Sequence, residues 1–521
     1  MKSEIRIPND EFQMTNSCPR RSSLRTWNDS IRHSSFVIRH SSAAMMASVV
    51  MAIVIAALAG CAVGPNYKQP DVDTPAAYRT AESDATQSGE TNSFADLNWK
   101  DVYDDPQLRE YIAEALTNSW DIKIAAARVL QAQAQARVVR SQFFPNAYAG
   151  GDLVSSRASK EGPNPIPTGV DRDAEYGDAF VFAPSYEVDL WGRIRRANEA
   201  ARARLLASMD AQRTVRQTLV ANVAATYLQL LELDLALEIG RASLISRSNS
   251  LVLTTAREEG GVASMQDVYQ SRILVATAEA SIASTLRDIE QTENALNLLL
   301  GRNPGTVARG IPLVDQKLKT NVPAGLPSDL LQRRPDIRGA ENELVAANAD
   351  IGQAKAAFFP QVTLTGMFGY QTTALSELFT GSAEMWQFGP AVTMPLFTGG
   401  RLKAEYKFAK ARFDEALAQY QRTVQNAFRE VSDALIAYQR NQEFFARQLE
   451  LTEANRGAAD LANVRYEGGV TSYLEVLYNE QQLFDAELLL AQARRNELLS
   501  VVQLYRALGG GWTTPTFEAK N

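Results

Sequence analysis

Two copies of one arrangement, a strand-like segment followed by a very long helix, make up most of this chain. Three pairs of motifs lie 208 residues apart, namely Gly192-Arg193 with Gly400-Arg401, Gly261-Val262 with Gly469-Val470, and Leu300-Gly301 with Leu508-Gly509. Self-similarity at a fixed spacing indicates tandem structural repeats that must bury their apolar faces against neighbours. A chain of this kind is not expected to fold as an ordinary globular enzyme.

Upstream of the strand-like segments the spacing changes to 215 residues, since FFPN at 143–146 recurs as FFPQ at 358–361. The extra seven residues of the first copy fall in the loop Glu161–Gly169, which is rich in Pro and Gly. Loops tolerate insertions, so this segment is predicted to be the tip of a hairpin.

The long segments are predicted to form helical hairpins. In the first copy a helix from about Arg195 to Glu258 spans roughly 90 Å, turns at Gly260-Gly261 and returns from about Ser264 to Leu300. The second copy turns at Glu467–Val470 and returns to Leu508. Apolar residues recur at spacings of three and four, which favours coiled-coil packing along the whole length. A continuous helix from Asp105-Pro106 to the first Phe-Phe-Pro is also expected.

After each Phe-Phe-Pro the apolar period changes to two. Val362, Leu364, Phe368 and Tyr370 are expected on one side of a strand in the second copy. In the first copy one side is expected to carry Phe180, Phe182, Tyr186 and Val188. Alternation with aromatic residues is typical of membrane β-barrel strands. Four strands cannot close a barrel, so closure would need several chains; a soluble antiparallel sheet on the helices is the alternative.

Composition restricts the chemistry of the chain. Both histidines, His33 and His40, and one of the two cysteines, Cys18, precede Cys61. Cleavage before Cys61 would leave no His and a single Cys, so we expect no enzyme activity, no cofactor and no His or Cys metal site. The first 60 residues hold seven Lys/Arg and four Asp/Glu, and their removal changes the net charge from −7 to −10. Such an acidic chain is not expected to bind nucleic acid.

The N-terminus resembles a lipoprotein signal peptide. The apolar run Met45–Gly60 ends in small residues directly before Cys61, which favours cleavage there and implies a lipid on this cysteine. An uncleaved membrane anchor is the alternative. Met1 to about Arg32 is interpreted as an overextended start or an unstructured leader. The polar, Pro-containing stretch after Cys61 is expected to be an extended tether.

These features predict six segments along the chain. They are a removed leader and signal peptide at 1–60, a lipid-anchored tether at 61–97, a first repeat at 98–301 with a β-hairpin at about 144–192, a linker at 302–332, a second repeat at 333–509 with a β-hairpin at about 361–398, and a tail at 510–521.

Long ordered motifs in the chain resemble the lipoprotein outer membrane factors of tripartite (RND-type) efflux systems. The motifs are CAVGPNYKQP at 61–70, DLWGRIRRA at 189–197, the stretch at 330–366, PLFTGGRL at 395–402, RYEGGVTSYLEVL at 465–477 and ALGGGW at 507–512. The resemblance implies an α+β membrane protein, a homotrimer whose twelve-stranded outer-membrane β-barrel continues into a twelve-helix periplasmic α-barrel. It also implies a periplasmic adaptor protein, an inner-membrane pump and outer-membrane lipid as partners.

The resemblance also implies the site residues. The two hairpin turns would dock the adaptor through Gly260, Gly261, Val262, Ala263 and Ser264, and through Gly468, Gly469, Val470, Thr471 and Ser472. Leu474 corresponds to an apolar ring that closes the pore. One turn later, Tyr478 stands where close relatives have an aspartate, so aromatic closure is a hypothesis here. Glu475 points about 100° away from Leu474 around the helix.

The predicted function is passive conduction of small molecules through an outer-membrane exit duct, with the energy supplied by the pump. The same duct used for type I protein secretion is one alternative, and a structural coiled-coil envelope lipoprotein is another. The acidic mature charge favours a lumen that attracts cations, although a summed charge does not say which residues face inward.

Overall fold

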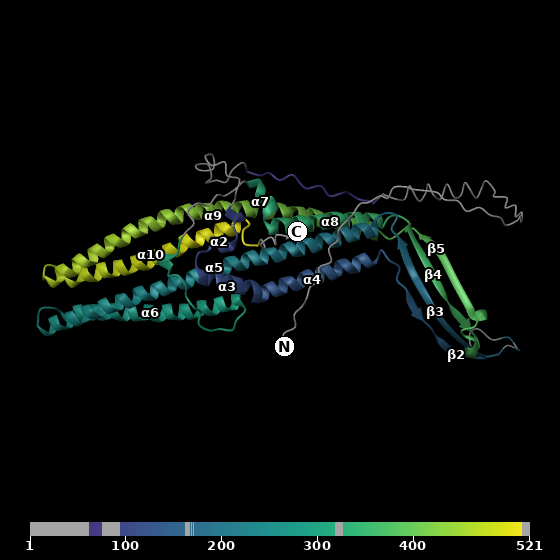
Figure 1. The fold of residues 1–521 in the computed structure, drawn as a ribbon, viewed down its shortest axis with the longest axis horizontal. Coiled ribbons are helices and arrows are strands. Elements are labelled where there is room, and N and C mark those ends of the chain that lie inside the picture. Colours follow the sequence, from purple (N-terminus) through teal and green to yellow (C-terminus); the bar gives the residue numbers. More distant parts are fainter. Residues whose placement is uncertain are drawn as a thin grey trace, which may run out of the picture. The chain divides into compact units, whose positions relative to one another are not determined.

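The computed structural model of the chain describes residues 62–75, 94–161, 167, 169, 171–317 and 327–512 (Figure 1). The predicted leader and Cys61 lie outside the described residues. Residues 60–521 form one compact unit. Its elements are η1 (Phe94–Asp96), α2 (Trp99–Val102), α3 (Pro106–Asn118), α4 (Trp120–Ser141), β1 (Tyr148–Gly150), β2 (Leu153–Arg157), β3 (Asp173–Val188), α5 (Arg193–Glu259), α6 (Met265–Leu300), η2 (Leu313–Asp315), α7 (Pro327–Arg333), α8 (Pro335–Ala356), β4 (Gln361–Thr372), η3 (Leu375–Glu377), η4 (Gly381–Ala383), β5 (Glu384–Thr393), α9 (Arg401–Glu467) and α10 (Tyr473–Ala507).

The two strand-to-helix junctions are confirmed. Helices α5 and α9 are each 67 residues long and begin directly after Gly192 and Gly400. Both glycines adopt the left-handed conformation, with φ of 79° and 86°. A side chain is strained in this conformation, which explains why glycine occupies the junction in both copies. Each long helix packs against its returning partner, α5 on α6 and α9 on α10 (Figure 1).

The expectation of one continuous helix from Asp105-Pro106 is wrong, because Ser119 separates two helices, α3 and α4. Ser119 has φ −54° and ψ 136°, and its N–H still bonds the Ala115 carbonyl. The end of α6 comes close at this point, since a Cβ on Gly301 would lie 2.6 Å from the Asn118 carbonyl oxygen. The second copy has the same break at Arg334, between α7 and α8. The close approach of α6 accounts for the break at Ser119, whereas the break at Arg334 directly precedes Pro335, which disfavours a helical conformation of the residue before it.

The strands form one antiparallel sheet in the order β1-β3-β4-β5, with β2 also paired to β3. Strands β1 and β2 are two halves of one outgoing strand that is interrupted at Gly151-Asp152. A Cβ on Gly151 would lie 2.7 Å from the Asp178 carbonyl oxygen, and the Asp152 N–H bonds the Asp178 carboxylate at 2.8 Å. Within the described residues the chain thus supplies four strand positions, and β1/β2 and β5 are the open edges of the sheet.

A β-bulge in β3 corrects the predicted face of Phe180 and Phe182. Ala183 pairs with Gly366 and Tyr186 with Leu364, so two residues of β3, Pro184 and Ser185, oppose the single residue Thr365 of β4. The bulge contains Pro184, which has no N–H for the ladder. The extra residue reverses the alternation, and Phe180 and Phe182 therefore face away from Tyr186 and Val188.

The two faces of the sheet differ in polarity. The register places an apolar set on one face, comprising Val181, Tyr186, Val188, Val362, Leu364, Phe368, Tyr370, Trp386, Phe388 and Val392. The other face carries the polar residues Asp178, Glu187, Gln361, Thr363, Thr365, Gln371, Gln387 and Thr393, together with Tyr148, Phe180, Phe182, Met367 and Met385. One apolar and one mainly polar face is the pattern of a membrane barrel wall.

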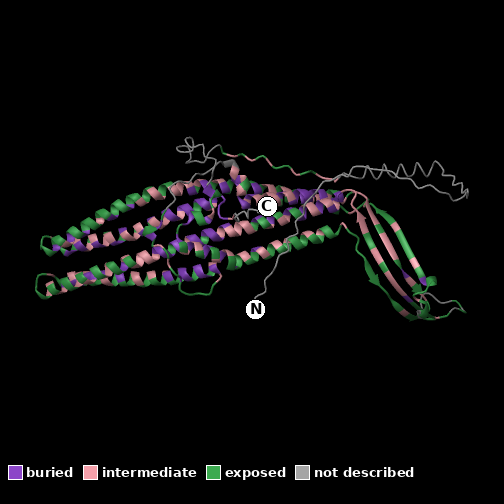
Figure 2. Cartoon of the chain, viewed as in Figure 1, coloured by how far each residue is buried: buried purple, intermediate pink, exposed green. Residues whose placement is uncertain are grey.

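The main core lies where the middle of the long helices meets α3 and the helix ends near Gly301 and Leu508. Its fully buried side chains include Tyr227, Leu230, Leu296, Leu300, Ile337, Tyr420 and Leu504. Buried residues gather in this zone, whereas the strands and the helical-hairpin ends are mostly intermediate or exposed (Figure 2). Of the described helices, α5 contains a stretch long and apolar enough to cross a membrane, yet 61% of it is buried in this core. Packing therefore accounts for its apolar character.

The segment after Cys61 packs on the helices rather than extending freely. The Val63 N–H bonds the Trp191 carbonyl at 2.9 Å, and Tyr67 donates to Glu341 at 3.1 Å. Ala62 contacts the strand-to-helix junction so closely that a Cβ on Gly192 would lie 2.7 Å from the Ala62 Cβ. The first described residue of the predicted tether thus lies at the base of the sheet.

Candidate functional site

The two helical-hairpin turns are built in the same way. In the first, the Val262 N–H bonds the Arg257 carbonyl at 2.8 Å and the Gly261 N–H bonds the Glu258 carbonyl at 2.8 Å. In the second, Val470 and Gly469 donate to the Arg465 and Tyr466 carbonyls at 2.9 and 3.0 Å. This pair of bonds is the Schellman C-cap, which requires a left-handed residue after the last turn. Gly261 and Gly469 supply it, with φ of 74° and 72°.

The returning helices begin differently. In α6 the Ser264 hydroxyl accepts the Asp267 N–H at 3.3 Å and the Asp267 carboxylate accepts the Ser264 N–H at 3.1 Å, which is a capping box. In α10 the Ser472 side chain makes no such bond. Thr471 instead donates to the Glu475 carboxylate, which also pairs with Arg465 at 3.1 Å. Glu475 therefore closes the second turn and is not a free carboxylate.

The turns present apolar side chains to solvent. Val262 and Val470, at equivalent positions, are 76% and 72% exposed. The other predicted docking residues, Gly260, Gly261, Ser264, Gly468, Gly469 and Ser472, are exposed, and Ala263 and Thr471 are partly exposed. Two glycines directly before an exposed valine give a turn that another chain can approach closely.

Arg257 links the two turns. Its guanidinium donates to the Tyr466 carbonyl at 3.1 Å and the Glu467 carbonyl at 3.3 Å, at the C-terminus of α9. It also lies 4.4 Å from the centre of the Tyr466 ring. A cation is favourable at a helix C-terminus, where carbonyls lack helical partners. The end of α5 is thereby fixed to the end of α9.

The predicted gate residues lie on one exposed side of α10. Leu474 and Tyr478 are both 64% exposed, whereas Tyr473 and Val476, in the same part of α10, are buried. Residues four apart lie on the same face of a helix, so the two side chains form a short ladder. Nothing in the described part of the chain covers this ladder.

Polar groups are buried between α10 and the first hairpin. Arg247 of α5 is fully buried and donates to the Leu274 carbonyl at 3.2 Å and to Gln481 at 3.1 Å. Ser246 donates to the buried Glu480 at 3.3 Å. Burial lowers the pKa of Arg247, while Glu480 opposes this shift. The contact between the hairpins is consequently polar here and apolar in the main core.

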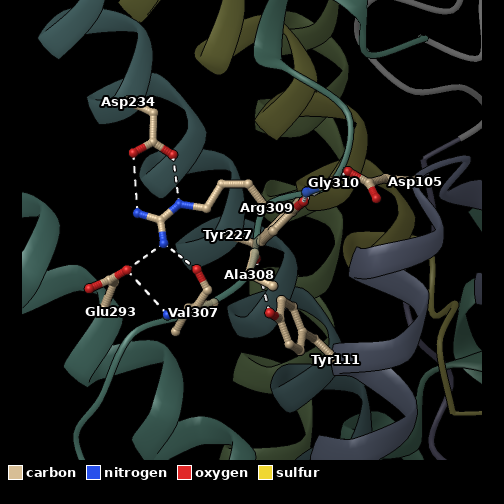
Figure 3. Close-up of polar contacts among 9 residues, drawn as sticks. All are labelled: Asp105, Tyr111, Tyr227, Asp234, Glu293, Val307, Ala308, Arg309 and Gly310. Carbon is tan, nitrogen blue, oxygen red and sulfur yellow. Dashed lines mark hydrogen bonds and ion pairs between the residues drawn. The ribbon is translucent and has the colours of Figure 1, made fainter.

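A second polar cluster holds the segment after α6, and Figure 3 shows its members Asp105, Tyr227 and Arg309. Gln316 also belongs to it through its bond to Asp105. Asp105 is fully buried, caps α3 by accepting the Gln107 N–H at 2.8 Å, and accepts Tyr227 at 2.9 Å, the Ile311 N–H at 3.0 Å and Gln316 at 2.8 Å. This carboxylate joins α3, α5 and the segment after α6. The sequence analysis did not predict this role of Asp105. The sequence indicated only that an Asp before Pro106 can begin a helix.

Arg309 completes this cluster on its other side. Its guanidinium pairs with Asp234 at 2.8 Å and with Glu293, while the Tyr111 hydroxyl bonds the Ala308 carbonyl at 2.9 Å (Figure 3). Burial lowers the pKa of Arg309. The hydrogen bonds to both carboxylates raise the pKa by more than burial lowers it, so it lies above the ordinary arginine value. These contacts are structural, because every group is matched by an oppositely charged or hydrogen-bonding partner.

No group of His, Cys, Asp and Glu suited to hold a metal occurs within the described residues.

The comparisons with known proteins agree with this geometry. The model of the family described as outer membrane efflux protein matches residues 111–302 and 326–510, one segment in each repeat. The toluene efflux pump outer membrane protein TtgF of Pseudomonas putida is 38% identical over 461 residues, which are 88% of this chain and 95% of that protein. The solvent efflux pump outer membrane protein SrpC of Pseudomonas putida has the same identity over 88% of this chain and 96% of its own. The open state of the Neisseria gonorrhoeae MtrE outer membrane channel has a TM-score of 0.77 at 30% identity, and the match covers 87% of this chain and 99% of that one.

Proposed function

The chain belongs to the outer membrane efflux protein family, and we propose that three copies of it assemble into the exit duct of a tripartite pump. The observation that carries this proposal is a sheet with two open edges joined to helices of 67 residues. Such helices span about 100 Å at 1.5 Å per residue, so they would extend the duct far beyond the sheet.

Lipid allows no unpaired strand edge, so β1/β2 of one chain must pair with β5 of another. Four strand positions per chain give twelve strands in a trimer. Helices α4, α5, α8 and α9 give twelve helices beneath them. The apolar face of the sheet would contact lipid, and the mainly polar face would line the lumen.

Lipidation of Cys61 fits this arrangement. Ala62, the next residue, contacts Gly192 at the base of the sheet. A lipid on Cys61 would therefore enter the membrane leaflet beside the barrel. One lipid-bearing residue strengthens membrane attachment without determining the topology of the chain. Replacing Cys61 with Ser is expected to abolish incorporation of labelled palmitate; continued incorporation would contradict the assignment.

The turns at Gly260–Ser264 and Gly468–Ser472 are proposed to dock a periplasmic adaptor, which connects the duct to an inner-membrane pump. Exposed Val262 and Val470 provide apolar contacts at both turns. Leu474 and Tyr478 are proposed to close the pore, because three copies of an exposed apolar ladder would form a narrow ring that excludes water.

Electron microscopy of the detergent-extracted protein, with the mass of the oligomer measured on the same sample, tests the proposal. A three-fold tube longer than roughly 100 Å is expected from the helix length. A monomeric rod would refute the barrel and favour a lipid-anchored spacer. Type I protein secretion would use the same tube, and a transport assay with small molecules and with a secreted protein separates the two uses.

A further inference from the structure

A charged groove of about 760 Å³ lies where the strands meet the helices. Helix α8 packs between α5 and α9, and all three helices line the groove. Its ionisable side chains are Arg193, Arg204, Arg401 and Arg412, with the carboxylates Asp350 and Glu405. The lining thus holds four arginines and two carboxylates, and a third carboxylate, Glu187, pairs with Arg193 from outside the lining.

Three of the arginines have carboxylate partners. The pairs are Arg193 with Glu187 at 2.5 Å, Arg401 with Glu405 at 2.8 Å, and Arg204 with Asp350. Arg412 forms no ion pair within the described residues, and its guanidinium lies 6.0 Å from the centre of the Phe408 ring. Phe408 is 66% exposed. Arg412, whose charge also acts on Glu343 of α8, thus stands beside an accessible aromatic ring.

The positions of these arginines are unfavourable for the helices that carry them. Neither α5 nor α9 has an acidic residue in its first turn, and each begins with arginine. The N-terminus of a helix favours negative charge. At α5, however, the Asp189 carboxylate already accepts the Ile194 and Arg195 N–H groups at 3.1 and 2.9 Å, and Glu187 pairs with Arg193. Helix polarity therefore does not explain Arg401, and an anion in the groove would be attracted by this side chain and by the N-terminus of α9.

The predicted tether identifies the outer side of α8. Tyr67 bonds Glu341 and the Pro65 carbonyl accepts Asn348 at 3.1 Å, so the tether covers the Glu341/Asn348 side. Asp350 follows Glu341 by nine residues and lies about 180° away around the helix. A tether that leads to a membrane lipid runs outside the tube, so the groove on the opposite side of α8 faces the lumen.

The strands give the same orientation independently. Gln361 and Thr393 line the groove and pair with each other across β4 and β5. They belong to the mainly polar face of the sheet, which faces inward in a membrane barrel.

We propose that this groove binds the carboxylate of anionic aromatic solutes as they pass from the helical tube into the barrel. Arg401 and Arg412 would bind the carboxylate and Phe408 the aromatic ring. The inference rests on the proposed function, because it requires an assembled duct with three such grooves around its lumen. It differs from the expectation, drawn from net charge alone, of a lumen that attracts cations.

The helix supplies a matched control for the experiment. Lys403 and Lys410 are exposed and lie nine residues from Arg412 and Arg401, respectively. Nine residues correspond to about 180°, so the two lysines occupy the outer side of α9. The variant R401E/R412E reverses two lumenal charges per chain, and K403E/K410E reverses two outer charges.

Reversal potentials of the purified protein in planar bilayers, measured in gradients of potassium benzoate and of potassium chloride, test the proposal. R401E/R412E is expected to lower the anion-to-potassium permeability ratio about threefold or more, with the larger effect for benzoate, since potentials of a few kT act on ions in a charged lumen. K403E/K410E is expected to leave the ratio unchanged. Each variant is also measured in combination with Leu474→Ser, so that closure at the proposed constriction does not hide a change in the permeability ratio.

An unchanged ratio in R401E/R412E, or an equal change in K403E/K410E, would overturn the proposal while conduction itself persists. If R401E/R412E does not assemble, R401Q/R412Q is measured instead, with K403Q/K410Q as its control and the same directions expected. Absence of any conductance in the unmodified protein and in Leu474→Ser would refute the duct itself, and the groove proposal with it.

Discussion

At the scale of single residues, Tyr478 is the proposed gate position at which the family resemblance leads us to expect an aspartate. It stands one turn from Leu474 with an equally exposed side chain. A neutral aromatic ring cannot repel or attract ions as an aspartate would, so any closure at this level is by size and dewetting.

The variant Tyr478→Ala is therefore expected to raise the single-channel conductance in planar bilayers. Gln482 provides the control, because it is exposed one turn further along α10. Gln482→Ala is expected to leave the conductance close to that of the unmodified channel. Equal conductance of Tyr478→Ala and the unmodified channel would remove Tyr478 from the gate.

Asp105 carries a second prediction at this scale. Asp105→Ala removes a helix cap and leaves Tyr227 and the Ile311 N–H without their acceptor. The free energy of unfolding is expected to fall by about 3 kcal/mol, combining a lost cap with buried unsatisfied donors. The neighbouring Asp104 forms only an exposed ion pair with Arg109 at 3.6 Å, so Asp104→Ala should change it by less than about 1 kcal/mol. Denaturant unfolding of the two variants checks this, and similar losses would contradict it.

At the scale of elements, the two helical hairpins depend on one left-handed residue each. Gly260 and Gly261 are adjacent, but Gly260 has φ −77° and Gly261 has φ 74°. Gly261→Ala is expected to destabilise the turn by about 1 to 2 kcal/mol, because alanine is strained in the left-handed region. Gly260→Ala should be neutral or slightly stabilising, because it restricts the unfolded chain.

Hydrogen exchange of the turn amides distinguishes the two variants. Faster exchange is expected around Val262 in Gly261→Ala only. The pair Gly468 and Gly469 allows the same comparison in the second hairpin, and Gly469→Ala is the variant expected to exchange faster. Equal exchange in both members of a pair would show that the cap geometry does not control the turn.

At the scale of the whole molecule, three carboxyls in different helices make stability depend on pH; Glu232 and Glu497 are buried, whereas Glu343 is exposed. Desolvation raises the pKa of Glu232 in α5, Glu343 in α8 and Glu497 in α10 above the ordinary glutamate value, with partial compensation by arginines. A raised folded pKa means that the folded state binds more protons than the unfolded chain. Their contribution to stability is complete below the unfolded pKa of about 4.3 and is lost as the pH rises through the raised values.

The triple variant E232Q/E343Q/E497Q should therefore lose less stability between about pH 4.5 and pH 7.5 than the unmodified protein. Glutamates with a raised pKa lose their protons in this range of pH. Thermal dissociation of the assembly at several pH values measures this difference. A variant with the same or a steeper pH dependence would contradict the role of these three carboxyls.

Much of the architecture was readable from local patterns. The two repeats, their turns at Gly261 and Gly469, the strand-to-helix junctions and the number of strand positions all follow from spacing, glycine placement and the change of apolar period. These features depend on residues close together in the chain. Lipidation at Cys61, the docking turns and the gate remain proposals drawn from the family resemblance.

Other features depend on contacts between distant segments, and only the tertiary structure decided them. The break at Ser119 arises where α6 ends against it, and the bulge at Pro184 reversed the faces of Phe180 and Phe182. The Asp105 cluster joins residues about 200 positions apart. The orientation of Arg412 also depends on packing. The net charge sums all residues of the chain, whereas only the residues that face the lumen act on the ions inside it. Local sequence therefore determined the elements, and packing determined which of their faces meet.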